Sequence, residues 1–301
     1  MPHSRENMRG ALFMMASMAG FTLNDTMIKL VSRDLELFQA VFLRGIVATL
    51  LLGALAWHQG ALRFRPDRRD LKIIALRTFA EVGATFCFLT ALFNMPLANA
   101  TAILQSLPLA VTLAASVFLG HRVGWKRYLA IAIGFAGMLV IVRPGTEGFN
   151  VYALWAVAAV GFVTLRDLLS YKLAPETPSM FVALFTSAAV MVLAGVAATT
   201  QEWRAVPLDT VVYLSAAAGF ILVGYIAAVT AMRHGEIAFV SPFRYSALIW
   251  ALLLGLLVFG DIPDRYTVVG SLIVVGTGIY TFYRERRLLR RVDERGEHEQ
   301  H

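Results

Sequence analysis

Charged residues occur inside long apolar segments of this 301-residue chain, where they have the chemistry to bind a polar solute or a proton. These residues are Asp25, Lys29, Arg44, Arg77, Glu81, Arg166, Asp167 and Arg244. Ionisable side chains are costly inside a bilayer, so each one marks a candidate functional site. Guanidinium groups bind carboxylate, phosphate or polarised carbonyl oxygens, whereas carboxylates pair with cations or carry protons.

Three of these residues, Lys29, Arg77 and Arg166, lie close to the ends of their apolar segments. Side chains of this length can extend along a helix until the charge reaches the lipid headgroups. We therefore favour headgroup contact over a binding role for these three residues.

Asp25 and Glu81 lie deeper, about 10 Å from the nearer end of a helical segment at 1.5 Å per residue. Their short side chains must face protein, water or substrate. Asp25 precedes Lys29 by four residues, and Arg77 precedes Glu81 by the same spacing, so each pair shares a helix face. This spacing is equally compatible with two internal ion pairs and with a role in substrate or proton binding.

Arg44 and Arg244 are also deep in their segments and have no acidic residue at helical spacing. We expect both to anchor a polar or anionic group of a substrate through their planar guanidinium donors. The alternative is an ion pair with Asp25, Glu81 or Asp167 across helices.

Uncharged polar residues extend this candidate substrate site to Asn24, Gln105 and Tyr245. Pro108 follows Gln105, and Pro242 precedes Tyr245; proline frees a helical carbonyl and permits a bend. Interruptions in corresponding parts of two halves are typical of transporter binding sites. We expect Gln105 and Tyr245 to orient a substrate, and Asp25 or Glu81 to carry any coupled proton.

The elements that position these residues are predicted to be ten membrane helices. Apolar residues make up 58% of the chain and charged residues 16%, against roughly 25% charged residues in soluble domains. The apolar runs have about the length needed to cross the hydrocarbon core. They cover residues 10–31, 37–57, 73–94, 98–119, 128–142, 151–170, 179–199, 209–231, 237–258 and 266–283, and the fifth run can begin as early as Trp125.

The chain repeats itself at an offset of about 140 residues: Thr90 and Gly120 of the first half align with Thr230 and Gly260 of the second. Five crossings per half insert the second half upside down, and such inverted repeats are typical of alternating-access transporters. The predicted units are a first repeat at 10–145, a second repeat at 150–283 and a basic tail at 284–301.

The net charge of +7 reflects membrane topology rather than nucleic-acid binding. Most Lys and Arg residues fall in the segments that share a side with the N-terminus, and four lie on the other side: Arg33, Arg143, Arg204 and Arg265. The positive-inside rule then places both termini in the cytoplasm, in a multi-pass protein of the bacterial inner membrane.

Enzyme signatures are absent from the sequence, which contains no HExxH, GxSxG or Walker motif. The single cysteine, Cys87, excludes a disulfide or a cysteine-based metal site within one chain. We expect a non-enzymatic protein without a metal or cofactor, whose partners are a small-molecule substrate and the lipid bilayer, and whose oligomeric state is open.

An ordered set of motifs resembles the ten-helix branch of the drug/metabolite transporter superfamily, built from two EamA-like domains. In the first half the set comprises Leu107-Pro108-Leu109, Phe118-Leu119-Gly120-His121, Trp125, Gly134, Gly137 and Arg143-Pro144-Gly145. In the second half it comprises Ala238, Pro242, Tyr245, Gly260-Asp261, Pro263-Asp264 and Gly270. The family usually has a glutamate at the end of each fourth helix, whereas this chain has His121 and Asp261 there.

The resemblance implies a secondary transporter that moves a small organic metabolite across the cytoplasmic membrane by alternating access. Asn24-Asp25-Thr26, Arg44-Gly45, Arg166-Asp167 and the Ser241–Tyr245 stretch are similar to a proteobacterial subgroup that includes S-adenosylmethionine uptake carriers. Riboflavin transporters are similar in length and layout. We expect a flat cofactor such as riboflavin first, then S-adenosylmethionine, with an amino-acid or drug exporter or exchanger as alternatives and a non-transport membrane sensor as the different class.

Overall fold

The structure, a computed structural model, describes residues 2–120, 124–146, 148–174, 176–234 and 237–298. Over these ranges the chain is helical with short connections and contains no strand, which confirms the predicted all-α class. His121, the residue that departs from the family pattern in the first half, lies outside the described residues.

The helices before residue 146 are α1 (Pro2–Val31), α2 (Leu37–His58), α3 (Arg68–Asn94), α4 (Leu97–Leu104), α5 (Leu107–Phe118) and α6 (Trp125–Val142), with a 3₁₀ turn η1 (Ala61–Arg63). The later ones are α7 (Tyr152–Tyr171), α8 (Ser179–Ala198), α9 (Leu208–His234), α10 (Ile237–Val240), α11 (Ser246–Leu254) and α12 (Arg265–His298). A 3₁₀ segment η2 (Ser241–Tyr245) precedes α11, and a π-helical turn η3 (Gly255–Phe259) follows it.

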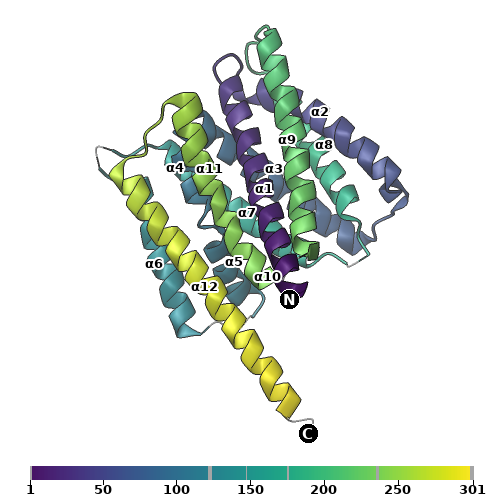
Figure 1. The fold of residues 1–301 in the computed structure, drawn as a ribbon. Coiled ribbons are helices and arrows are strands. Elements are labelled where there is room, and N and C mark those ends of the chain that lie inside the picture. The colour runs from purple at the N-terminus through teal and green to yellow at the C-terminus, as the bar shows by residue number, and fades with distance from the viewer. Residues whose placement is uncertain (1, 121–123, 147, 175, 235–236, 299–301) are drawn as a thin grey trace.

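Over the described part of the chain, nine helical segments are long and apolar enough to cross a membrane. One of them combines α4 and α5 (Leu97–Phe118), and another combines η2, α11 and η3 (Ser241–Phe259). The remaining long helix is α1, whose apolar run is interrupted by Asn24, Asp25 and Lys29. The chain is a multi-pass membrane protein, and its two ends lie at the same end of the bundle (Figure 1).

The observed helix boundaries follow local capping signals as well as hydropathy. The third helix begins at Arg68, before the predicted residue 73, because the Asp67 carboxylate accepts a hydrogen bond from the Asp70 N–H at 2.7 Å. The fifth predicted segment begins at Trp125, the earliest start considered. The last helix continues to His298, beyond the rest of the bundle, so the predicted tail is largely a continuation of α12 (Figure 1).

The longest helices pack in pairs that join the two halves of the chain: α1 against α9, α2 against α8, α3 against α7, and α6 against α12. Helix α4 contacts α11 in the same way. If each span is replaced by the corresponding span of the other half, the same set of pairs results. For example, the pair of α1 and α9 becomes the pair of α7 and α3, which is also present. The symmetry supports the predicted two repeats, which remain a prediction.

Glycines permit close approach at two of these helix pairs. A Cβ atom added at Gly270 on α12 would lie 2.6 Å from the carbonyl oxygen of Gly137 on α6. One added at Gly20 on α1 would lie 3.1 Å from the Gly224 backbone on α9. Small residues at such crossings are typical of membrane helix packing. The glycines that the repeat aligns at the ends of the fourth spans, Gly120 and Gly260, both have a φ of 70°, in the left-handed region.

Candidate functional site

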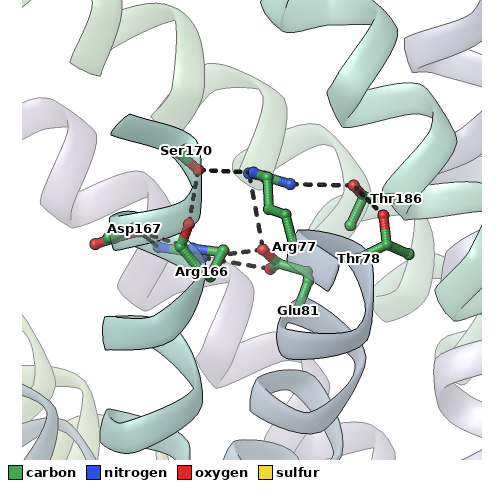
Figure 2. A network of polar contacts seen from close by, with 7 residues as sticks. All are labelled: Arg77, Thr78, Glu81, Arg166, Asp167, Ser170 and Thr186. Atoms are coloured by element: carbon green, nitrogen blue, oxygen red, sulfur yellow. Dashed lines mark hydrogen bonds and ion pairs between the residues drawn. The ribbon is translucent and has the colours of Figure 1, made fainter. Parts of the chain in front are cut away.

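The centre of the candidate site is an ion-pair network that joins α3 to α7 (Figure 2). The Glu81 carboxylate on α3 lies between two arginines and accepts hydrogen bonds from the Arg166 Nη1 atom on α7 at 3.2 and 3.4 Å. The Arg77 Nη2 atom, one helical turn before Glu81, is 4.0 Å from the same carboxylate. One acid therefore holds two cations from helices on opposite sides of the seam between the halves.

The arginines of this network have further partners on the second half of the chain. Arg77 donates from Nε to the Ser170 hydroxyl on α7 at 2.8 Å and from Nη1 to the Thr186 hydroxyl on α8 at 3.1 Å. Arg166 contacts its neighbour Asp167 at 2.8 Å. The two cations and two carboxylates sum to zero charge, as expected for side chains that are only 19–33% exposed within membrane helices.

A second set of charges lies on α1 and α2. The Asn24 amide donates to the Asp25 carboxylate at 2.9 Å, and its oxygen is 3.5 Å from the Arg44 Nη1 atom. Asp25 and Arg44 lie within electrostatic range of each other. However, neither residue takes part in an ion pair within 4.0 Å among the described residues. The Arg44 Nε atom is buried without a hydrogen-bond partner.

Tyr225 on α9 connects the two sets. It lies within electrostatic range of Arg44, Arg77, Glu81 and Arg166, and its ring packs edge-on against Phe21 of α1 with a centroid distance of 5.4 Å. The residue is nevertheless 47% exposed. Protein atoms therefore leave part of this tyrosine uncovered, although it stands among four charged side chains from three other helices.

The predicted interruptions in the two fourth spans are present, and they contact each other. Helix α4 ends before Gln105, and the corresponding span of the second half changes to the 3₁₀ segment η2. The Gln105 amide donates to the backbone carbonyls of Arg244 and Tyr245, at 3.4 Å in each case. Gln105 and Tyr245 are also the pair that the repeat aligns.

The side chains of η2 lie apart from the charged sets. Tyr245 is 5% exposed, and its hydroxyl group is buried without a partner beside Gly278 of α12. Arg244 is exposed. The structure therefore brings together Asn24, Asp25 and Arg44 and, next to them, Arg77, Glu81 and Asp167, whereas Gln105, Tyr245 and Arg244 form a separate region.

Lys29, Arg77 and Arg166, for which headgroup contact was favoured, all have partners within the protein, and headgroup contact stays a prediction. The Lys29 ammonium donates to the backbone carbonyls of Leu92, at 3.0 Å, and Met95. These carbonyls lie at the end of α3, where helical acceptors lack partners. Of the two ion pairs that spacing suggested, Arg77–Glu81 is present, whereas Lys29 turns away from Asp25 to the carbonyl groups.

Sequence reasoning missed three contributors to the network, Ser170, Thr186 and Tyr225, and placed Arg166 at the headgroups. Hydroxyl groups and tyrosines are frequent in membrane helices, so none of the three stands out in the sequence. The available signal was the Arg166-Asp167 pair on the segment that aligns with the first span, which already carries Asp25 and Lys29.

At the end of the bundle away from the termini, side chains bridge the seam between the halves. Gln39 of α2 donates to the Arg204 carbonyl at 2.7 Å and accepts from the Arg204 N–H at 3.1 Å. The Thr210 hydroxyl donates to the Asp34 carboxylate at 2.7 Å. An ion pair joins Arg143, after α6, to Asp264, before α12.

Comparison with known proteins connects this geometry to transport. Residues 8–143 match the sequence model of the EamA-like transporter family. The chain is 25% identical over 290 residues to an S-adenosylmethionine uptake transporter of Rickettsia felis, covering 95% of this chain and 96% of that protein. It is 27% identical over 274 residues to the pseudopaline exporter CntI of Pseudomonas aeruginosa, covering 87% and 92%.

Two further similarities concern part of the chain and its fold. A riboflavin transporter of Vibrio cholerae is 29% identical over 206 residues, which cover 66% of this chain and 67% of that protein. A solved crystal structure matches with a TM-score of 0.62 at 20% identity, covering 91% of this chain and 98% of the other, and thus supports the fold. Residues 8–143 of this chain are an EamA-like transporter domain of the drug/metabolite transporter superfamily.

Proposed function

We propose that this protein is a secondary transporter that moves a small organic metabolite across the bacterial cytoplasmic membrane by alternating access. The relatives named as uptake transporter, exporter and riboflavin transporter support a small-metabolite substrate without selecting one. In the proposed mechanism, residues 10–145 and 150–283 are two inverted repeats that rock against each other. The excess of Lys and Arg on the side of the N-terminus supports cytoplasmic termini, including the basic tail at 284–301.

The observation that carries this proposal is the charged set that spans the seam between the halves inside the membrane. Arg77 and Glu81 from α3 meet Arg166 from α7 at distances of 3.2 to 4.0 Å, and Tyr225 from α9 stands within electrostatic range of all three. Charges at this depth are expected where a polar solute or an ion passes.

The proposed roles of individual residues follow their positions. Arg44 binds a polar or anionic group of the substrate, with Asn24 beside it, and Asp25 or Glu81 carries any coupled proton. Gln105 and Tyr245 fix the relative position of the two interrupted fourth spans and thereby orient the substrate. Arg244 provides a second anchor from η2, where its side chain is exposed.

Reconstitution tests the proposal. Purified protein is reconstituted into liposomes that contain unlabelled riboflavin, S-adenosylmethionine or a mixture of the twenty standard amino acids. Exchange with the same labelled compound outside the liposomes is then measured. We expect exchange of at least one compound above protein-free liposomes. We also expect a strong decrease in Arg44→Ala and Arg244→Ala variants that insert normally. Unchanged exchange by Arg244→Ala refutes its role as an anchor, and no exchange of any compound contradicts transport of these metabolites.

A further inference from the structure

We propose that Asp25 and Arg44 bind the zwitterionic head of an α-amino acid or of a larger metabolite that carries one. The Arg44 guanidinium binds the carboxylate of this head, and the Asp25 carboxylate binds its ammonium group. This inference rests on the proposed transport function and specifies the class of substrate.

The Arg44 guanidinium has free donors where a carboxylate needs them. Its Nε atom has no partner, and the contact from its Nη1 atom to Asn24 is 3.5 Å, long for a hydrogen bond. A buried donor left unpaired costs about 1–3 kcal/mol. A guanidinium with unpaired donors is suited to a carboxylate, because the planar fork donates two parallel hydrogen bonds to its two oxygens.

The Asp25 carboxylate is similarly incomplete. Its Oδ1 atom accepts one hydrogen bond, from the Asn24 amide, although an ionised carboxylate has about four acceptor positions. Asn24 contacts both charged side chains, since it donates to Asp25 and accepts from Arg44. The amide thereby occupies the position between the opposite charges, which remain more than an ion-pair distance apart within the described structure.

The charge of the surroundings favours a ligand head with no net charge. Asp25 and Arg44 sum to zero, and the neighbouring set of Arg77, Glu81, Arg166 and Asp167 is joined by ion pairs and also sums to zero. An anion or a cation would leave one unbalanced charge in a poorly solvated region. A zwitterion satisfies both free groups and leaves the balance unchanged.

The same argument decides against an uncharged flat ligand such as riboflavin as the preferred occupant of this pair. The isoalloxazine ring offers amide and carbonyl groups, which leave an ionised carboxylate and a guanidinium without charged partners. Tyr225, 47% exposed and within electrostatic range of Arg44, provides an aromatic surface beside the head for the rest of the ligand.

The first test compares ligands on the unchanged protein. Binding to the purified full-length protein in detergent is measured for S-adenosylmethionine and for each standard amino acid, and then for the decarboxylated and the deaminated forms of the tightest binder. We expect removal of either group to weaken binding at least roughly tenfold, the effect of one lost charged hydrogen-bonding group. Equal binding of the truncated forms, or binding of riboflavin with no binding of any zwitterion, overturns the inference.

The second test assigns each group to its residue. In Arg44→Gln, we expect the intact zwitterion to bind at least roughly tenfold more weakly and the decarboxylated amine to bind as it does to the unchanged protein. In Asp25→Asn, the deaminated acid keeps its affinity and the intact zwitterion loses it. Glu36→Gln, in the exposed ion pair with Arg204, is the matched control and should change neither. If a variant does not fold, the ligand series on the unchanged protein still decides.

The outcomes separate this inference from the proposed function. If riboflavin is exchanged in liposomes and no zwitterion binds, the proposed transport function stands and the proposed binding of an amino-acid head is refuted. Zwitterion binding that depends on Asp25 and Arg44, without exchange in liposomes, keeps the binding site and contradicts transport. Affinities of both variants that equal those of the unchanged protein refute the assignment of this pair.

Discussion

The charges on α3 and α7 are joined, whereas the opposite charges on α1 and α2 remain apart. Glu81 contacts both Arg77 and Arg166 within 4.0 Å, but Asp25 and Arg44 share only the bridging amide of Asn24. Breaking a joined pair leaves an uncompensated charge between packed helices. Asp25 and Arg44 form no ion pair with each other, so a ligand that binds both breaks no ion pair within the protein. We therefore expect the first set to stabilise the seam and propose that the second binds the ligand.

The largest expected effect is on stability, from Glu81→Gln. The change removes the carboxylate that two arginines share, so we expect the free energy of unfolding to fall by about 3 kcal/mol. Unfolding in mixed detergent and dodecyl sulfate micelles measures it. Glu36→Gln, in a pair whose side chains are 40–51% exposed, serves as the control and should cost less than about 1 kcal/mol. Equal losses in the two variants contradict a stabilising role for the network.

Arg44→Lys examines the other side of the comparison. The positive charge remains near Asp25, but the planar donors are lost, so we expect transport to fall by about tenfold or more. Stability should change far less than in Glu81→Gln, because the Arg44 Nε atom donates to no protein group. The same unfolding assay, combined with liposome exchange, distinguishes the two effects. A stability loss as large as that of Glu81→Gln shows that Arg44 belongs to the structural set.

A smaller effect is expected at the edge of the network, from Thr186→Val. The hydroxyl accepts from Arg77 at 3.1 Å and lies 3.3 Å from the Thr78 hydroxyl. Valine has a similar shape, so the change isolates these hydrogen bonds and should cost about 1 kcal/mol. Thr199→Val, at the C-terminal cap of the same helix, is the control, because the Thr199 hydroxyl donates to the Val196 carbonyl of α8 at an exposed position. No difference between the two variants means that Glu81 and Ser170 hold Arg77 without a contribution from Thr186.

Helix positions were predictable from the sequence because the thickness of the bilayer sets the length of each apolar run. Helix α2 was expected at 37–57 and extends over Leu37–His58, and α8 was expected at 179–199 and extends over Ser179–Ala198. The interrupted fourth spans were also expected, from Pro108 and Pro242. These features depend on local composition, which the sequence shows directly.

Side-chain partners were less predictable, because they depend on which helices face each other. Arg166 and Glu81 are separated by 85 positions, and no local pattern indicates that α3 packs against α7. The partners of Lys29 were unpredictable for a related reason: its position near a span end indicated the headgroups, but its ammonium group donates to backbone carbonyls at the end of α3. The candidate site residues were therefore identified as a set, but their division into a joined and an unjoined group needed the structure.

The smallest expected effect concerns the Arg143–Asp264 ion pair, which lies outside the membrane helices. Solvent there reduces the contribution of an ion pair to the free energy of unfolding. Partial burial opposes ionisation of Asp264, but the Thr267 N–H and the Arg143 guanidinium outweigh it and lower the pKa of this carboxyl below its usual value. A lowered folded pKa gives stability that is complete above the unfolded pKa and is lost as the pH falls through the folded pKa.

Asp264→Asn keeps an acceptor for Thr267 and removes only the charge. We therefore expect the variant to be less stable than the unchanged protein by no more than about 1 kcal/mol at neutral pH. This difference should stay constant down to about pH 5, begin to shrink near the ordinary pKa of aspartate at about 4, and be lost as the pH falls through the lowered folded pKa. Unfolding midpoints of both proteins from pH 3 to 8 measure it. A difference as large at pH 3 as at pH 8 would mean that shape rather than charge joins this pair. A difference as large as that of Glu81→Gln would mean that solvent exposure is not the reason why joined pairs differ in strength.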